Sequence, residues 1–311
     1  MSSSPATMRV SDTPPVIVAY GMTKVGKTVD TLYSFPEAHF IGDVRGFRGS
    51  AKIVGWVPHN IHEAPTIGEA LKVIDKIGKT KPSSRPAMVV MDDFSLMVNE
   101  FKAAQHAKGR RGWDLNNDVI SMVQRIIWAA KGLNIGIVFG CHEKGPALDK
   151  GKLGHPDVAF YTLANTLAAV CDAVFHATNF ISATHKGWPF GYYGGGLHKA
   201  QWICGDRFNV ALDQIPLNLR EWAIAAGFDT QTQIPRPPGY EGVDELVNTM
   251  VSILSSGQGT VPQAKDHLIR LYRDGHALLT NESVTQWVIR DVIDRYTIRS
   301  MQSDKVFSIF D

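Results

Sequence analysis

The fold of this chain follows from one stretch near its start, Gly21-Met22-Thr23-Lys24-Val25-Gly26-Lys27-Thr28, directly after the apolar residues 16–20. The stretch has the spacing of a phosphate-binding loop, in which a glycine is followed by four residues and then Gly-Lys-Thr. Glycine lets the backbone turn tightly and approach a phosphate without a Cβ in the way. The backbone N–H groups then form a nest for an anion, to which a following helix adds the positive end of its dipole. The stretch therefore predicts a nucleotide-binding site between a buried strand and a helix.

Two side chains of this loop have defined chemistry with ATP. We expect Lys27 to reach the β- and γ-phosphates and the Thr28 hydroxyl to bind Mg²⁺. Residues 87–93 are an apolar run closed by two acids, Asp92 and Asp93. Apolar strands that end in aspartate are common, so this run indicates a metal site only in combination with the loop upstream. Together they predict that Asp92 completes the Mg²⁺ shell that Thr28 begins, with ATP and Mg²⁺ as cofactors.

Apolar runs and helical patterns alternate along the following chain. Residues 38–43 and 135–140 are typical of buried strands, and residues 66–77 begin with a capping box and continue at helical spacing. Strands that are apolar throughout indicate a mainly parallel α/β sheet covered by helices on both faces. Ligands of such sheets bind at the carboxyl ends of the strands. The polar residues predicted at those ends are Lys27, Asp43, Asp92 and His142.

The bulk composition excludes several classes of protein. With 311 residues, 44% hydrophobic and 20% charged, the chain has the composition of an ordinary soluble protein. A net charge of +2 gives no global basic field, so any nucleic-acid site must be a local patch. Three cysteines without metal-type spacing argue against a disulfide framework and a zinc site. We therefore expect a cytoplasmic protein, and the lack of a membrane-length apolar run predicts no membrane partner.

Composition also predicts the domain organisation. Residues 1–14 are rich in Ser, Thr and Pro and predict a disordered leader. Residues 15–234 form the predicted α/β domain. The proline-rich residues 235–240 predict a linker. Residues 241–311 show helical patterns only and predict a small all-helical carboxyl-terminal module.

Over roughly residues 15–230, the chain resembles a phage-type RecA/KaiC-like P-loop ATPase. The loop is similar to the Gly-x-x-Lys-x-Gly-Lys-Thr loop of small phage RecA-like proteins, and His142 ends a strand where that family carries a γ-phosphate sensor. The resemblance implies a RecA-like fold, ATP hydrolysis and a homo-oligomer with active sites between protomers. It also implies work on single-stranded DNA in phage recombination, annealing or repair in the host cytoplasm. A phage single-strand-binding or replication protein is a further implied partner.

The chain departs from this family where the attacking water should be oriented. Relatives place a catalytic Glu just after the second strand, but here that region is Asp43-Val44-Arg45-Gly46. We expect a loop over residues 44–49, followed by a short strand at 53–57. Asp93 is the first candidate to orient the water and Asp43 the second, although Asp93 could equally cap the next helix. His142 either reads the γ-phosphate or is satisfied by backbone. Lys24 either contacts phosphate or is a solvated loop lysine.

Two basic segments are candidates for binding single-stranded DNA, because cations that follow phosphates and an aromatic base platform are what such binding requires. The alternative for either segment is a solvated loop. The first segment comprises Lys102, Lys108, Arg110, Arg111 and Trp113, and the second Lys144, Lys150 and Lys152. Separately, Arg207 either reaches the nucleotide of a neighbouring subunit or forms an ion pair with Asp206 or Asp213.

Two other functions remain open. One is a nucleotide-dependent assembly or scaffold protein with little turnover, which the missing Glu favours. The other is a DNA-packaging motor, which is less favoured because Asp92-Asp93 lacks the Asp-Glu ending of such motors.

Overall fold

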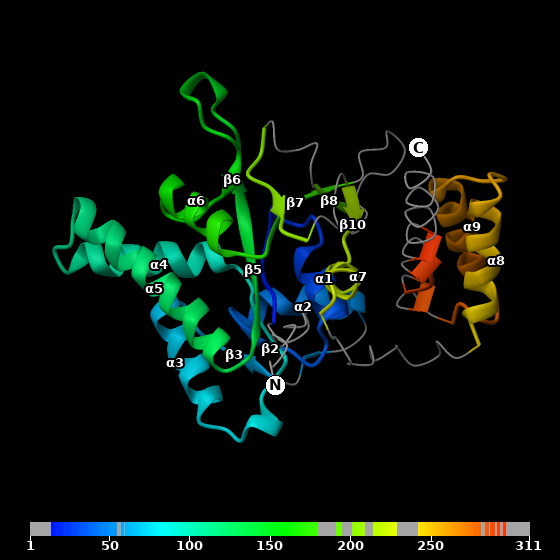
Figure 1. Ribbon diagram of the computed structural model, residues 1–311. Coiled ribbons are helices and arrows are strands. Elements are labelled where there is room, and N and C mark those ends of the chain that lie inside the picture. Colours follow the sequence, from blue (N-terminus) through cyan, green and yellow to red (C-terminus); the bar gives the residue numbers. More distant parts are fainter. Residues whose placement is uncertain are drawn as a thin grey trace, which may run out of the picture. The chain divides into compact units, whose positions relative to one another are not determined.

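The computed structural model separates into two compact units (Figure 1). Unit 1 comprises Met1–Phe47 and Pro58–Gln233, and unit 2 comprises Arg48–Val57 and Ile234–Asp311. The expected linker and all but the last residue of the expected leader lie outside the residues that the structure describes. The described residues are 14–54, 57–58, 60–179, 191–194, 201–208, 214–228, 242–280, 284–285, 287–289, 291–292 and 295–296.

Unit 1 is built on a mixed sheet in the order β10-β8-β7-β1-β5-β4-β2-β3. Strands β7, β1, β5, β4, β2 and β3 run parallel; beyond β7, β8 pairs antiparallel with β7 and β10 pairs antiparallel with β8. Strand β6 pairs antiparallel with β5, and β9 with β7. The bounds are β1 (Val16–Gly21), β2 (His39–Ile41), β3 (Ile61–His62), β4 (Met88–Met91), β5 (Gly136–Lys144), β6 (His155–Pro156), β7 (Ala173–Asn179), β8 (Gly191–Gly194), β9 (Gly205–Asp206) and β10 (Gln214–Pro216).

Strand β1 lies in the interior of this sheet because it is apolar throughout and buried along its whole length. It pairs in parallel with β5 on one side and β7 on the other. Its last residue, Gly21, lies opposite Ala177 of β7, and a Cβ added to Gly21 would collide with the Ala177 carbonyl oxygen. Glycine is therefore required where β1 leaves the sheet and the phosphate-binding loop begins.

Helices cover both faces of the sheet, as the alternation of β1 side chains requires (Figure 1). Val16, Val18 and Tyr20 pack into a core with α3 (Ile67–Gly78), α4 (Phe94–Ala107), α5 (Gly112–Gly132) and α6 (Tyr161–Val170). The other face receives α1 (Lys27–Ser34), the start of α2 (Val44–Val54) and α7 (Leu219–Ala225). There Phe40 meets Phe47 of α2 at 5.5 Å, and Phe175 meets Trp222 of α7 at 5.4 Å between ring centroids. Short 3-10 turns lie at Pro82–Ser84 and Leu148–Lys150.

The predicted α/β class, with a mainly parallel sheet flanked by helices, is confirmed. One local prediction is wrong: residues 44–54 form the helix α2 rather than a loop followed by a strand. Phe47, Ala51 and Val54 recur at helical spacing and are buried. Their burial outweighs the cost of the two glycines, Gly46 and Gly49, within the helix.

Unit 2 is helical where the structure describes it. Helix α8 (Asp244–Ser255) and helix α9 (Val261–Arg273) pack together through apolar faces that include Val251 and Leu268. The indole N–H of the buried Trp287 donates to the Val54 carbonyl oxygen at 3.1 Å, which ties residues 48–57 into this unit. In the described part of the chain, no helix combines the length and the apolar character needed to cross a membrane.

Candidate nucleotide-binding site

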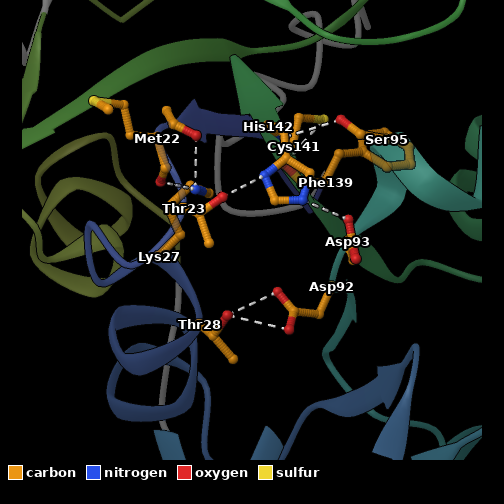
Figure 2. Close-up of polar contacts among 11 residues, drawn as sticks. Met22, Thr23, Lys27, Thr28, Asp92, Asp93, Ser95, Phe139, Cys141 and His142 are labelled. Carbon is orange, nitrogen blue, oxygen red and sulfur yellow. Dashed lines mark hydrogen bonds and ion pairs between the residues drawn. The ribbon is translucent and has the colours of Figure 1, made fainter. Parts of the chain in front are cut away.

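The phosphate-binding loop connects the end of β1 to the start of α1 at the carboxyl edge of the sheet (Figure 2). Its turn places Lys24 at φ 66° and Gly26 at φ 106°, both in the left-handed region. Gly26 can adopt this conformation without strain because it has no Cβ. Lys27 then begins α1, so the first N–H groups of this helix and its positive dipole end face the loop.

Lys27 places a half-buried cation inside the loop. Its ammonium donates to the carbonyl oxygens of Gly21 at 2.9 Å and Met22 at 2.8 Å. Burial lowers the pKa of Lys27, and the nearby carboxylate of Asp92 opposes this effect. A desolvated ammonium gains most from an anion placed beside it, so this position suits a phosphoryl oxygen.

Thr28 and Asp92 meet across the site. The Thr28 hydroxyl donates to both carboxylate oxygens of Asp92, at 3.0 Å and 3.1 Å (Figure 2). Asp92 directly follows β4, and desolvation raises its pKa to about 6 despite the hydrogen bond from Thr28. A hydroxyl and a carboxylate held this close form the oxygen pair that Mg²⁺ selects.

Glycines on the two strands that flank β4 approach Asp92 closely. Gly42 follows β2, and a Cβ there would lie 3.0 Å from the Asp92 carbonyl oxygen. Gly140 lies in β5, and a Cβ there would lie 3.2 Å from Asp92 Oδ1. Side chains at either position would fill the space around the carboxylate. The half-buried carboxylate of Asp92 between two glycines, its hydroxyl partner Thr28 and the half-buried ammonium of Lys27 therefore fit an Mg-nucleotide.

His142 and Asp93 form the opposite wall of the site. The His142 Nε2 lies 3.0 Å from Asp93 Oδ1, and its Nδ1 lies 3.4 Å from the Thr23 hydroxyl of the loop (Figure 2). The hydrogen bond with Asp93 raises the pKa of His142, which favours the imidazolium form. The backbone N–H of His142 donates to Ser95 Oγ at 2.9 Å, which fixes this part of β5 against α4. The imidazole therefore lies between the loop and the Asp93 carboxylate.

The two water-orienting candidates have different surroundings. Asp93 occupies the position before α4 with φ 55°, but its side chain makes no capping hydrogen bond, so the contact with His142 is what distinguishes it from a helix cap. Asp43 pairs with Arg45, whose guanidinium approaches at 3.0 Å and whose backbone N–H donates to the carboxylate at 2.8 Å. The structure therefore brings Asp93 to Lys27, Thr28, Asp92 and His142, and turns Asp43 toward Arg45.

The first basic segment is not brought together as one cationic surface. Lys102 donates to the Ala159 carbonyl and lies 4.4 Å from the Phe160 ring centroid. Arg110 pairs with Asp118 at 2.6 Å, and Arg111 donates to the carbonyl oxygens of His106 and Arg110. Lys108 and Trp113 are exposed at the connection between α4 and α5.

The second basic segment forms a hairpin. Strand β5 runs beyond the nucleotide site as far as Lys144 and returns as β6. The tip is closed by two backbone hydrogen bonds between Ala147 and Lys152, at 2.9 Å and 3.0 Å. Lys144, Lys150 and Lys152 are all exposed. These three cations therefore lie on an extension of the strand that carries His142.

Two further basic candidates lie elsewhere in unit 1. Lys24 is exposed on the loop. Arg207 follows β9 beside the start of β7, and its guanidinium donates to the Ala169 carbonyl oxygen at the end of α6. The start of β7 is the edge of the sheet opposite the phosphate-binding loop. An action of Arg207 on a neighbouring subunit stays a prediction.

Sequence reasoning missed the groups that hold His142 in place. Thr23 and Ser95 contact it from the loop and from α4, and no motif marks either residue. It also missed a pair between β5 and β7, where Nε2 of the buried His176 lies 2.7 Å from Glu143 Oε2 and the imidazole stacks on Trp202 at 3.6 Å. The only signal was that Glu143 directly follows His142.

Comparisons with known proteins add a likeness of fold. Among solved structures, the chain is similar to the RadB recombinase, with 17% identity, 58% of this chain and 79% of that chain covered, and a TM-score of 0.38. No family model and no curated protein matches the chain. At this TM-score the similarity carries no inference about activity, for which the site geometry is the basis.

Proposed function

We propose that this chain is a P-loop ATPase that binds Mg-ATP, hydrolyses it slowly and acts on single-stranded DNA in phage recombination, annealing or repair. One observation carries the proposal. Lys27 and Thr28 at the start of α1, Asp92 and Asp93 after β4, and His142 in β5 converge at the carboxyl edge of β1, β4 and β5.

Each residue has a distinct role in this proposal. Bound Mg²⁺ would supply charge neutralisation for the phosphates. Thr28 and Asp92 would hold the metal, and the Lys27 ammonium would leave the loop carbonyls to bind the transferring phosphoryl group. His142, whose pKa is raised by its contact with Asp93, donates a hydrogen bond to a γ-phosphate oxygen. Asp93 accepts a hydrogen bond from the attacking water and orients it.

Slow turnover follows from the surroundings of the two carboxylates. The carboxylate of Asp93 contacts His142, and the carboxylate of Asp43 contacts Arg45. A carboxylate oxygen that already contacts a cation is less available to accept a hydrogen bond from water. Both pairs therefore reduce the capacity of this site to polarise water.

The hairpin of β5 and β6 supports DNA as the second ligand. Exposed Lys144 ends β5, the strand that carries His142, and exposed Lys150 and Lys152 lie in the turn that follows it. Phosphate contacts of this kind give salt-dependent and sequence-independent affinity. Strand β5 and its hairpin would then contact both the nucleotide and the DNA, which supports stimulation of ATP turnover by DNA.

ATP turnover with and without a single-stranded oligonucleotide tests the proposal. We expect stimulation by DNA, which should disappear in the triple variant Lys144→Ala, Lys150→Ala, Lys152→Ala. A matched control is Lys72→Ala, Lys76→Ala, Lys79→Ala, which removes the same charge from exposed positions at α3. The salt slope of binding should fall by about one for each DNA phosphate that the variant no longer neutralises. An equal decrease of DNA stimulation in the two triple variants would contradict the role of the hairpin.

A second function is favoured by the paired carboxylates: nucleotide-dependent assembly with little turnover. In that case ATP binds tightly, turnover stays at background and DNA does not change it. The same assay separates the two functions, because the ATPase proposal fails if Lys27→Ala and the wild type hydrolyse ATP at equal rates.

A further inference from the structure

The hairpin formed by β5 and β6 projects beyond the rest of the sheet (Figure 1). Its two strands pair through Glu143 with Pro156 and through Lys144 with His155. A two-stranded ribbon is marginally stable by itself in water. The contacts that the base of the hairpin makes with the rest of unit 1 therefore decide how the hairpin is oriented.

His176 of β7 holds the outgoing strand of the hairpin. Its Nε2 lies 2.7 Å from Glu143 Oε2, at the short end of the range for a hydrogen bond between nitrogen and oxygen. The side chain of His176 is 4% exposed and that of Glu143 is 21% exposed. Because little water reaches this contact, it restricts both side chains more than a fully exposed pair would. The outgoing strand is thereby tied to β7.

The returning strand is tied to the same histidine through Trp202. The indole stacks on the His176 imidazole, with 3.6 Å between the ring centroids and 14° between the ring planes. Gly154 packs on that indole, since a Cβ at this position would collide with the ring. Two backbone hydrogen bonds accompany the contact: the Gly154 N–H donates to the Gln201 carbonyl at 2.7 Å, and the Ile203 N–H donates to the Gly154 carbonyl at 2.8 Å. Glycine is therefore required where the returning strand approaches Trp202.

Tyr20 connects this cluster to the phosphate-binding loop. Its ring centroid lies 5.1 Å from that of His176 and 6.2 Å from that of Trp202. Its hydroxyl donates to the Ile203 carbonyl oxygen at 3.0 Å. Tyr20 directly precedes Gly21, the first residue of the loop. One largely buried cluster of polar and aromatic side chains therefore joins the start of the loop, β7 and both strands of the hairpin.

The cluster differs from the neighbouring core of unit 1, which consists of apolar side chains. Burying a histidine and a carboxylate costs desolvation that an apolar pair would avoid. What the polar pair adds is direction, because a hydrogen bond restricts the angle between its two groups and an apolar contact does not. The cluster is therefore suited to orienting the hairpin, and not only to stabilising the sheet.

We propose that Glu143 and His176 are positioning residues for the response of this ATPase to DNA. Together with Trp202, they hold both strands of the hairpin in the orientation from which DNA bound at its lysines acts on His142, the residue before Glu143. The inference rests on the proposed DNA-stimulated ATPase function. The hold on the hairpin, however, needs neither nucleotide nor DNA, so it can be tested, and can fail, separately from that function.

Amide hydrogen exchange of the full chain, without nucleotide or DNA, tests the hold on the hairpin. His176→Phe keeps a ring that can stack on Trp202 and removes the hydrogen bond to Glu143. Residues 144–156 should then exchange about tenfold faster than in wild type, as expected for the loss of one hydrogen bond. The exchange of residues 16–20 in β1 is the internal reference and should remain at the wild-type rate.

A matched pair of glycines tests the returning strand. Gly154→Ala places a Cβ against the Trp202 ring, so residues 144–156 should again exchange faster. Gly145→Ala, in the same hairpin, meets nothing within 4 Å and should exchange as wild type does. The two glycine variants also decide the test if His176→Phe does not fold. Exchange in Gly154→Ala as slow as in Gly145→Ala overturns the proposal.

ATP turnover separates positioning from a purely structural role. We expect His176→Phe and Gly154→Ala to keep the basal rate without DNA and to lose stimulation by a saturating single-stranded oligonucleotide. Glu143→Ala should lose this stimulation too, whereas Glu143→Gln, which can still form a hydrogen bond with His176, should retain it. Wild-type stimulation in Glu143→Ala, or its loss in Glu143→Gln, overturns the proposal. A wild type without stimulation contradicts the proposed DNA function and the role of the pair in it, while the exchange result still shows whether the cluster holds the hairpin.

Discussion

Strands β4 and β2 are neighbours in the sheet, and each is followed by an aspartate at the same edge, yet the two carboxylates have different partners. Asp92, after β4, accepts the Thr28 hydroxyl at 3.0 Å and 3.1 Å. Asp43, after β2, pairs with Arg45 at 3.0 Å. Only β5 separates β4 from β1, whereas β2 lies one strand, or about 4.8 Å, farther away. The position of a strand relative to the loop, rather than the residue type at its end, decides which carboxylate can serve the phosphates.

The largest effect should come from neutralising the carboxylate near the loop. Asp92→Asn removes half of the Thr28–Asp92 pair, and we expect ATP turnover to fall by about 10³-fold, as for loss of a group that stabilises transition-state charge. Asp43→Asn is the matched control and should lower turnover by less than about tenfold. Initial rates at several Mg²⁺ concentrations measure both. Similar losses in the two variants would remove the distinction between the strand ends.

A smaller effect is expected at the second acid after β4. Asp93→Asn should lower the maximal rate by about 10²-fold, the range of a lost general base, with little change in ATP affinity. Rapid-quench turnover and equilibrium binding of a fluorescent ATP analogue separate the two quantities. Full turnover in Asp93→Asn would leave Asp43 as the remaining candidate, and the Asp43→Asn variant then decides.

Alanine should be harmful at the glycine that packs on Asp92 and favourable at the glycine that follows Asp43. Gly140→Ala places a Cβ 3.2 Å from Asp92 Oδ1, so we expect the Mg²⁺ concentration at half-maximal rate to rise about tenfold. Gly46→Ala, beside Asp43 in α2, meets nothing within 4 Å. It should stabilise the protein by about 0.5–1 kcal/mol and leave the Mg²⁺ requirement unchanged. Magnesium titrations and urea unfolding test the two variants. A Gly140→Ala protein with wild-type Mg²⁺ dependence would show that a Cβ at this position does not disturb Asp92.

The smallest effect concerns a histidine pair between β2 and β3. His62 Nε2 lies 3.0 Å from His39 Nδ1, and burial lowers the pKa of both residues below the ordinary value. As pH falls through about 6.5, the unfolded chain takes up protons before the folded one, so stability is present above that pH and lost below it. Solvent screening limits the loss to at most about 1 kcal/mol.

Urea unfolding at pH 7.5 and pH 5.5 measures this loss. The double variant His39→Asn, His62→Asn should show a smaller difference in unfolding free energy between the two pH values than wild type. An unchanged difference would place the pH dependence elsewhere.

The parts of the site that could be predicted are those set by local sequence. The loop, Thr28 and Asp92 belong to motifs whose spacing fixes their geometry, so the structure places them together as the residues indicated. The partners of His142 could not be predicted, because Thr23 and Ser95 approach it from elements distant in sequence. Helix α2 could not be predicted because its two glycines are poor helix formers. The helix forms because Phe47 and Val54, at helical spacing, are buried. The pairing of Arg110 with Asp118 likewise depends on the turn into α5.

Unit 2 is assembled from two stretches of sequence, and this has a consequence for cutting the chain. Residues 48–57 belong with residues from 234 onward, joined by the hydrogen bond from Trp287 to Val54. A fragment that stops near residue 234 would keep Ala51 and Val54 but lose the side chains that bury them in unit 2. Such a fragment should aggregate or be clipped by proteases around residue 50, because it exposes apolar surface. Supplying residues 234–311 in trans should then restore its solubility by complementation.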